Sequence, residues 1–313
     1  MKIAICGLWH VHAEGYYKTA AQFGEVVGVY EPNDAFREDF LSRNPIPVFD
    51  SMEQLLQSGA DAAIVSTSSD THADVMVRLA NAGMDIFTEK VLALTTEECL
   101  RVEEAVKRNG VRFVISFPHK FNPAVRAVKA VADSGELGKI NYFRFRNVHS
   151  GSTKNWLPAH FYNAKECGGG AMIDLGAHGM YLADWFLGMP ESASSTFTLA
   201  CESEETAKKN IDRVEDNAVT VLRYANGCIA VNETGFVSQG CPMILEVGGE
   251  LGRAYMMGNV AEKQTVETGE PVALAVGEAL PFPIQRFCQG ETVEGCGMEE
   301  AKNLTRLMEM AYE

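Results

Sequence analysis

The sequence lacks three features that are each typical of a class of proteins, and each absence argues against that class. It has no surplus of positive charge, because 27 Lys and Arg face 42 Asp and Glu and give a formal net charge of -15. Binding to nucleic acid or to an anionic membrane needs a basic face, so we expect neither partner. It also has no apolar run of about 18 residues and no cleavage-site pattern after Met1 to Gly7, which disfavours membrane spanning and export.

Paired cysteines are the third absence. The eight cysteines are scattered, without a Cys-x-x-Cys pair or a zinc-finger spacing to histidine. We therefore expect reduced thiols in a cytoplasmic protein. They are Cys6, Cys99, Cys167, Cys201, Cys228, Cys241, Cys288 and Cys296.

What the first half contains is an alternation of short β-branched runs with segments of helical period, typical of a doubly wound parallel sheet. The expected strands are Lys2 to Cys6, Glu25 to Tyr30, Ala62 to Ser66, Met84 to Thr88 and Val111 to Phe117. The expected helices are His12 to Gln22, Asp34 to Arg43, Met52 to Gln57, Thr71 to Ala82 and Thr96 to Arg108, several closed by a glycine such as Gly24, Gly83 or Gly110.

The second half changes pattern after Asn122-Pro123. We expect a helix to Asp133, a strand over Ile140 to Val148, and a helix that opens at Cys167-Gly-Gly-Gly170 and runs to about Phe186. Consecutive hairpins then predict an antiparallel sheet: Asn217 to Tyr224 with Cys228 to Phe236, and Met243 to Val247 with Gly252 to Met257. The last helix is expected over Met298 to Tyr312.

The predicted fold is therefore α/β with two domains. Residues 1–118 form the dinucleotide-binding domain with a parallel sheet, and residues 119–313 form a domain for substrate binding and oligomerisation. The C-terminal helix is a candidate to pack back on the first domain.

The first strand-to-helix turn reads Gly7-Leu-Trp-His-Val-His12, and only Gly7 matches the dinucleotide fingerprint. The turn still opens a helix whose N-terminal amides can bind phosphate. Gly7, Trp9, His10, Val11 and His12 are thus candidate cofactor contacts. Glu31 lies at the end of the next strand. Its carboxylate could accept hydrogen bonds from the ribose hydroxyls and repel a 2'-phosphate, which favours NAD over NADP. The alternative is an ordinary surface glutamate.

His10 and His12 also invite a metal interpretation. A metal needs three ligands, and a loop does not project alternate residues onto one face as a strand does, so we predict no metal.

Two further groups could carry chemistry. Asp174 and His178 are four residues apart on a helix, so the carboxylate could orient an imidazole that acts as a general base. The glycines before them would let a ligand approach closely. Lys90, directly after an expected strand, could stabilise an alkoxide in the crevice at the strand ends. Each group could equally be structural.

Four segments together resemble the Gfo/Idh/MocA family, named for glucose-fructose oxidoreductase and inositol dehydrogenase. They are Ala63-Ile-Val-Ser-Thr-Ser-Ser-Asp-Thr-His72, Ala82-Gly-Met-Asp-Ile-Phe-Thr-Glu-Lys90, Ser134-Gly-Glu-Leu-Gly138 and Gly168-Gly-Gly-Ala-Met-Ile-Asp-Leu-Gly-Ala-His178. Their order and spacing match the family over nearly the whole chain.

The resemblance implies a Rossmann domain followed by an α/β domain with a large open antiparallel sheet. It also implies Lys90 near nicotinamide and substrate, with Asp174 and His178 at the substrate hydroxyl. Thr67, Ser68, His72 and Glu89 would lie along the cofactor, and Lys120 would reach substrate or cofactor.

Three departures from the family pattern stand out. Trp9 and His12 replace fingerprint glycines. Val91 replaces the proline of a Glu-Lys-Pro motif, so if relatives have a cis peptide there we expect a trans bond here. Tyr181 replaces a second aspartate, which removes one partner for the substrate or for a carboxylate.

The leading hypothesis is an NAD(P)-dependent dehydrogenase acting on the CH-OH group of a sugar, sugar derivative or cyclitol. In it His178, oriented by Asp174, takes the hydroxyl proton while hydride passes to nicotinamide, and Lys90 is the alternative proton carrier. Two other hypotheses stay open: glycoside cleavage by transient oxidation and elimination, and a non-catalytic cofactor-binding regulator.

Weaker candidates complete the prediction. Trp156, His160 and Tyr162, before the glycines, could line a substrate pocket or simply pack the loop. An uncovered face of the antiparallel sheet would make the chain a homodimer or homotetramer.

Overall fold

The computed structural model of the chain describes residues 1–201 and 213–313. Within them the chain forms two compact units. The first combines Met1–Ser116 with Pro281–Thr305, and the second combines Phe117–Leu280 with Arg306–Glu313.

The first unit is built on a five-stranded parallel sheet in the order β2-β1-β3-β4-β5. Its strands are β1 (Lys2–Cys6), β2 (Glu25–Tyr30), β3 (Ala62–Val65), β4 (Asp85–Thr88) and β5 (Phe113–Ile115). The strand order reverses direction between β1 and β3, and in such sheets ligands bind outside the carboxyl ends of the strands at that point. β1 and β3 are apolar and almost wholly buried because helices cover both faces.

Helices connect these strands and end largely where the sequence predicts. They are α1 (Ala13–Phe23), α2 (Asp34–Arg43), α3 (Met52–Leu56), the short 3-10 turn η1 (Ser69–Thr71), α4 (His72–Asn81), α5 (Thr96–Asn109) and α10 (Pro283–Cys288). Gly83 and Gly110 follow helices with φ of 78° and 65°, the left-handed conformation that glycine favours. Gly24 also ends a helix, but in an extended conformation.

The second unit contains an eight-stranded sheet in the order β13-β12-β11-β10-β6-β9-β8-β7. Its strands are β6 (Ile140–Val148), β7 (Ser192–Thr198), β8 (Asn217–Arg223), β9 (Ile229–Gly235), β10 (Ile244–Gly249), β11 (Gly252–Met257), β12 (Val260–Thr265) and β13 (Val272–Ala273). Both predicted hairpins are confirmed. The sheet is mixed, because β6 and β9 pair in parallel while the other neighbours are antiparallel. The predicted α/β class is thereby confirmed.

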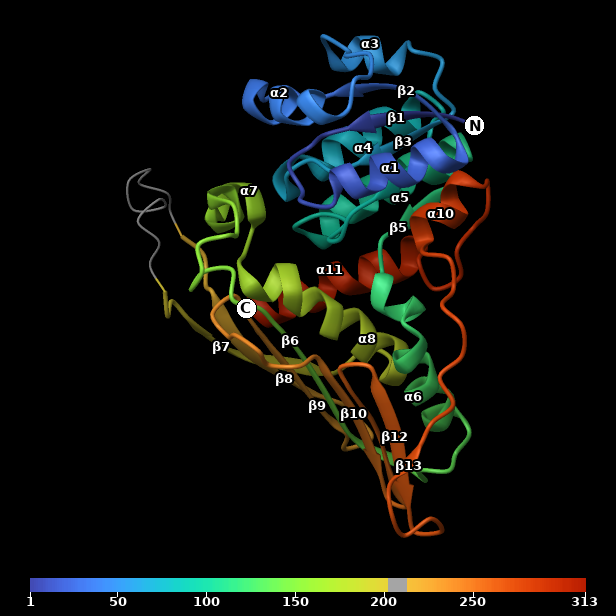
Figure 1. Cartoon of the computed structure of the whole chain (residues 1–313), viewed down its shortest axis with the longest axis vertical. Coiled ribbons are helices and arrows are strands. Elements are labelled where there is room, and N and C mark those ends of the chain that lie inside the picture. The colour runs from blue at the N-terminus through green and yellow to red at the C-terminus, as the bar shows by residue number, and fades with distance from the viewer. Residues whose placement is uncertain (202–212) are drawn as a thin grey trace. The chain divides into compact units, whose positions relative to one another are not determined.

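Three helical segments contact strands of this sheet (Figure 1): α6 (Pro123–Asp133), the π-helical turn η4 (Met172–Gly176) and α8 (Ala177–Leu187). The unit also contains the short segments η2 (Pro118–Phe121), η3 (Ala159–Tyr162) and α7 (Ala164–Cys167). The last helix, α11 (Met298–Tyr312), has the predicted bounds, and its residues are divided between the two units.

Gly169 and Gly170, before η4, leave room for other parts of the protein, and close approach of a ligand to the glycine segment stays a prediction. A Cβ atom on Gly169 would lie 2.2 Å from the Tyr312 hydroxyl, and one on Gly170 would lie 1.9 Å from the Glu215 carbonyl oxygen. The Gly170 amide also donates to the Glu215 carboxylate at 3.1 Å. The glycines therefore let Glu215 and Tyr312 approach the start of the segment that carries Asp174 and His178.

Gly170→Ala is expected to destabilise the protein by at least about 2 kcal/mol, because the obstructing atom is a backbone carbonyl that cannot rotate away. Gly15→Ala, inside α1, is the matched control. Nothing lies within 4 Å of its added Cβ, so a gain of about 0.5–1 kcal/mol is expected. Urea unfolding of both variants measures the difference, and equal stabilities would contradict this account of Gly170.

Candidate active site

The turn between β1 and α1 follows the carboxyl end of a central strand. Gly7 has φ of 89°, and a Cβ atom there would lie 2.6 Å from the Thr67 amide nitrogen. The Gly7 amide donates to the Tyr30 carbonyl, and the His10 amide donates to the Ser66 carbonyl. The turn is thus tied to both neighbouring strands. The side chains of Trp9, Val11 and His12 project from this turn, with 52% of the Val11 side chain exposed.

Glu31 lies at the end of β2 and is only 5% exposed, so it is not a surface glutamate. One carboxylate oxygen accepts from the Leu8 amide at 2.6 Å and the other from the Asn33 amide at 2.8 Å. Burial raises the pKa of Glu31, while these amides oppose the shift. A carboxylate has about four acceptor sites, so ribose hydroxyls could still bind.

Polar side chains gather at the end of β3. The hydroxyl oxygen of Thr67 is buried and has no hydrogen-bond partner among the residues that the structure describes. Ser68 lies at the N-terminal boundary of η1, and its hydroxyl contacts the side chains of Asp70 and Thr71. An unpaired buried hydroxyl at this edge is what a bound dinucleotide would satisfy, so the residues present fit such a cofactor.

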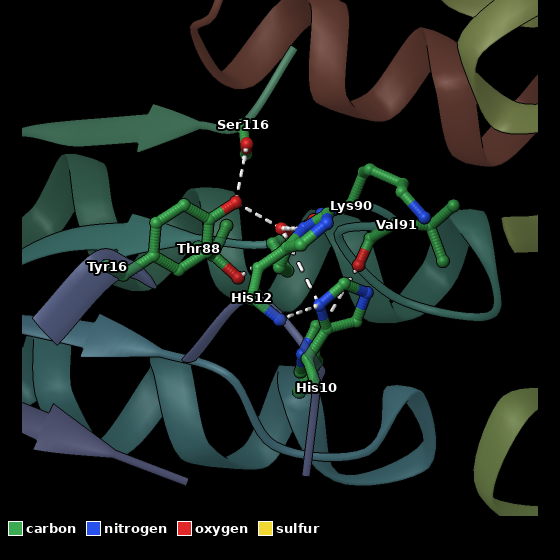
Figure 2. A network of polar contacts seen from close by, with 9 residues as sticks. His10, His12, Tyr16, Thr88, Lys90, Val91 and Ser116 are labelled. Carbon is green, nitrogen blue, oxygen red and sulfur yellow. Dashed lines mark hydrogen bonds and ion pairs between the residues drawn. The ribbon is translucent and has the colours of Figure 1, made fainter. Parts of the chain in front are cut away.

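Glu89, the residue after β4, lies in a network of polar side chains, of which Figure 2 labels His12, Tyr16 and Ser116. Glu89 is 2% exposed. His12 Nδ1 lies 2.7 Å from Glu89 Oε1, and the Tyr16 hydroxyl donates to the same oxygen. The Tyr16 hydroxyl also contacts Ser116 Oγ at 2.8 Å, and the Lys90 amide donates to Glu89 Oε2 at 3.0 Å.

The charge state of Glu89 follows from these neighbours. Burial by itself would raise its pKa, but His10, His12 and Lys90 outweigh burial and hold the pKa well below the usual range. Glu89 is therefore an ionised carboxylate inside the first unit. Its charge is maintained near neutral pH only because cationic and hydrogen-bonding groups face it.

His10 and His12 both face Glu89, which corrects our argument that a loop would keep them apart. His10 Nδ1 lies 3.7 Å from Glu89 Oε1, and the two imidazole rings are 4.7 Å apart between centroids. The turn brings them together because the His12 amide donates to His10 Nδ1 at 3.2 Å. Ligand atoms of the three residues lie within 4.8 Å of one another.

Lys90 is 5% exposed and follows Glu89 at the carboxyl edge of the sheet. The Lys90–Val91 peptide bond is cis, so the expectation of a trans bond was wrong. His72 Nδ1 contacts the Val91 carbonyl oxygen at 2.9 Å, and both residues are buried. Burial lowers the pKa of His72. This contact holds the segment that follows Lys90.

In the second unit, His178 is the second residue of α8 and is 6% exposed. Its Nδ1 lies 3.0 Å from the Tyr181 hydroxyl, and that hydroxyl accepts a hydrogen bond from the His119 amide at 3.0 Å. The His119 ring packs edge-on against the His178 ring, 4.5 Å between centroids. Tyr181, which we treated as a lost partner, is instead the residue that holds the His178 imidazole.

Asp174 is half-buried in the π-helical turn η4. Turns of this kind occur often at functional sites. Burial lowers the pKa of His149, and the Asp174 charge opposes that shift, which places this carboxylate near the His149 imidazole. The orienting role of Asp174 toward His178 stays a prediction.

Lys120 is 4% exposed, and aromatic rings surround its ammonium group. Its Nζ lies 5.1 Å from the centroid of Phe117, 6.0 Å from Tyr181 and 5.8 Å from Trp185. Stacking of a cation on aromatic faces offsets part of the cost of burying it. Lys120 therefore shares Tyr181 with His178.

The three loop residues before the glycines have different environments. Trp156 is 53% exposed and lies 4.6 Å from His149, centroid to centroid. The His160 carbonyl accepts from the Cys167 thiol. Tyr162 is 2% exposed, and its hydroxyl contacts Ser152 Oγ at 2.6 Å. Tyr162 is thus part of the core, whereas Trp156 is accessible.

Sequence reasoning did not select Tyr16, Ser116 or His149. Tyr16 lies one helical turn after His12, so helical spacing could have identified it as a neighbour. Ser116 directly follows β5 and His149 directly follows β6. Both are distant in sequence from their partners, and only the fold brings them together.

Comparison with known proteins covers both units. Residues 1–117 match the model of an oxidoreductase family with an NAD-binding Rossmann fold, and residues 125–255 match the GFO/IDH/MocA C-terminal domain. The chain belongs to the GFO/IDH/MocA family.

Individual relatives match over part of their lengths. The scyllo-inositol 2-dehydrogenase (NAD(+)) of Bacillus subtilis (strain 168) is 35% identical over 139 residues, 44% of this chain and 39% of that protein. The myo-inositol 2-dehydrogenase of Thermotoga maritima is 26% identical over 224 residues, 71% of this chain and 63% of that protein. A levoglucosan dehydrogenase solved with NADH and levoglucosan superposes with a TM-score of 0.83 at 18% identity, covering 100% of this chain and 96% of its own. The last likeness shows the fold.

Among the described helices, none has the length and apolar character needed to cross a bilayer.

Tyr181→Phe is expected to lower the free energy of unfolding by about 1–3 kcal/mol, because the His119 amide and His178 Nδ1 lose their shared partner. Tyr224→Phe is the matched control. The Tyr224 hydroxyl is buried without a hydrogen-bond partner among the described residues, so its removal should be neutral or stabilising. Chemical denaturation compares the two, and a neutral Tyr181→Phe would contradict the assigned contacts.

Proposed function

We propose that this protein is an NAD-dependent dehydrogenase that transfers hydride between nicotinamide and a hydroxyl-bearing carbon of a sugar, sugar derivative or cyclitol. The observation that carries the proposal is the buried Lys90 beside the ionised Glu89 at the carboxyl edge of a family-type nucleotide-binding sheet. Relatives named inositol and levoglucosan dehydrogenases support this substrate class. Their names do not favour glycoside cleavage or a non-catalytic regulator.

Cofactor contacts are proposed for the β1–α1 turn, for the end of β3 and for Glu89. The group at these positions would be Gly7, Trp9, His10, Val11, His12, Glu31, Thr67 and Ser68. The helix α1 points its N-terminal amides at this turn, which suits a pyrophosphate. When bound, nicotinamide supplies the acceptor for hydride.

His178 is the proposed base that takes the proton of the substrate hydroxyl, and Lys90 is the proposed group that stabilises the substrate oxygen. A base must have an unprotonated nitrogen, so in the active form Nδ1–H donates to the Tyr181 hydroxyl and Nε2 takes the proton of the substrate hydroxyl. The Tyr181 oxygen can accept this bond as well as the one from the His119 amide, because a phenol oxygen has two lone pairs. The Lys90 ammonium stabilises negative charge on the substrate oxygen.

Substrate contacts are proposed for Asp174, Lys120, Trp156 and His160. Asp174 would orient the His178 imidazole or bind a hydroxyl, and Trp156 offers an accessible aromatic face that suits the apolar face of a sugar ring. Tyr162 we now assign to packing.

The cellular setting is also a proposal. None of the eight cysteines forms a disulfide within the described part of the chain, which suits the reducing cytoplasm. One face of the eight-stranded sheet exposes apolar side chains that alternate with buried ones on β8, including Val219 and Val221, and a second copy of the chain would cover them in a homodimer or homotetramer. Sedimentation in solution tests this assembly.

Lys90→Ala and His178→Asn are each expected to slow the reduction of bound NAD by at least about 100-fold, because each removes a group that contacts the reacting hydroxyl. The measurement is stopped-flow absorbance with myo-inositol, scyllo-inositol and levoglucosan. Lys139→Ala, which removes an exposed lysine on the surface, is the control and should keep the wild-type rate. Wild-type rates in both site variants would refute the assignment.

Glu31→Gln is expected to narrow the preference for NAD over NADP several-fold, because a neutral amide no longer repels a 2'-phosphate. Titration of each dinucleotide into the protein measures the ratio of dissociation constants. Glu25→Gln, an exposed residue at the other end of β2, carries the same charge change and should leave the ratio unaltered. An equal shift in both variants would show that net charge, and not Glu31, sets the preference.

A further inference from the structure

The cluster of His10, His12 and Glu89 has the composition of a metal site. Two imidazoles and one carboxylate are a common ligand set for divalent first-row transition metals, with a fourth position left to water. His10 and Glu89 are almost fully buried, whereas His12 is 52% exposed and gives access from solvent. The cluster therefore combines two fixed ligands with one that can move.

The distances between the ligand atoms suit a metal. In a tetrahedral site with bonds of about 2.0–2.1 Å, neighbouring ligand atoms lie about 3.3 Å apart. The observed separations from Glu89 Oε1 are 2.7 Å to His12 Nδ1 and 3.7 Å to His10 Nδ1, on either side of that value. Ligand atoms of all three residues lie within 4.8 Å of one another, so small shifts of both His10 and His12 would give tetrahedral spacing.

His10 offers a nitrogen atom close to the Glu89 carboxylate. Its Nδ1 accepts a hydrogen bond from the His12 amide at 3.2 Å, so the lone pair of this nitrogen is used by that amide. A metal ion bound at Nδ1 would take this lone pair in place of the amide hydrogen bond, because a metal ligand must be deprotonated.

Supporting contacts surround the carboxylate. The Tyr16 hydroxyl and the Lys90 amide donate to the two Glu89 oxygens, and Ser116 holds the Tyr16 hydroxyl. Figure 2 shows the Tyr16 side chain joined by a dashed line to Ser116. Such outer contacts orient ligands in known metal sites and affect affinity by roughly 10–100-fold.

We propose that His10, His12 and Glu89 bind one divalent transition-metal ion, of the zinc or cobalt class, in the dinucleotide-free protein. Metal binding can be tested independently of the proposed dehydrogenase activity, because it needs neither nicotinamide nor substrate.

The test is titration of the dinucleotide-free protein with Co²⁺, followed by visible absorption and calorimetry, in a Cys241→Ser background that removes the exposed thiol. We expect one equivalent bound, with ligand-field bands of nitrogen and oxygen ligation and no thiolate charge-transfer band. His12→Gln and Glu89→Gln should each weaken binding at least 10-fold. His149→Gln and Glu25→Gln, the same substitutions outside the cluster, should bind as the parent does.

Tyr16→Phe serves as a second probe that leaves all three ligands in place. It should weaken binding about 10-fold or more, because the hydroxyl that orients Glu89 is lost. Circular dichroism confirms that each variant is folded before titration. The proposal is overturned if the parent binds no stoichiometric Co²⁺, or if His12→Gln and Glu89→Gln bind it as tightly as the parent.

Discussion

The ionised carboxylate of Glu89, buried at the carboxyl edge of the parallel sheet, is the constraint on which the candidate site depends. A buried charge is tolerated only where charges and hydrogen bonds compensate it. Here the compensation comes from the first turn, through His10 and His12, from α1, through Tyr16, and from the Lys90 amide. The same contacts therefore fix the turn, the helix and the lysine relative to one another.

This arrangement explains how a nucleotide-binding turn can lose its later glycines. A glycine-rich turn depends on backbone freedom and close approach. In this chain Gly7 alone provides the left-handed residue, and side-chain contacts do the rest: His12 faces Glu89, and Glu31 holds the Leu8 amide. The turn is specified by buried polar contacts where relatives of the fingerprint type use glycine.

In the second unit, side-chain contacts likewise hold a functional group in place, here the His178 imidazole. Tyr181 holds His178 through its hydroxyl and contacts Lys120 through its ring. Glu215 and Tyr312 both accept from the Gly170 amide, which precedes η4. Residues distant in sequence thus fix the segment on which the proposed base is carried.

The fold could be predicted from the sequence because the periodicity of apolar residues and the residues that form turns are local features of the sequence. The bounds of α2 and α11 and both hairpins followed from them, and the family motifs located Lys90 and His178. What could not be predicted were pairings across the fold. The contact of Tyr16 with Glu89 spans 73 residues, and that of Gly170 with Tyr312 spans 142. The parallel pairing of β6 with β9 was missed because period alone does not give strand direction.

The most direct test of the central claim is isotope transfer. The protein is incubated with NAD and myo-inositol that carries deuterium on its hydroxyl-bearing carbons, and the dinucleotide is analysed by mass spectrometry and NMR. The account predicts that one deuterium is transferred to C4 of the nicotinamide ring and that Lys90→Ala loses this transfer. Unlabelled dinucleotide across inositols and levoglucosan, with NAD binding demonstrated in the same samples, would contradict it.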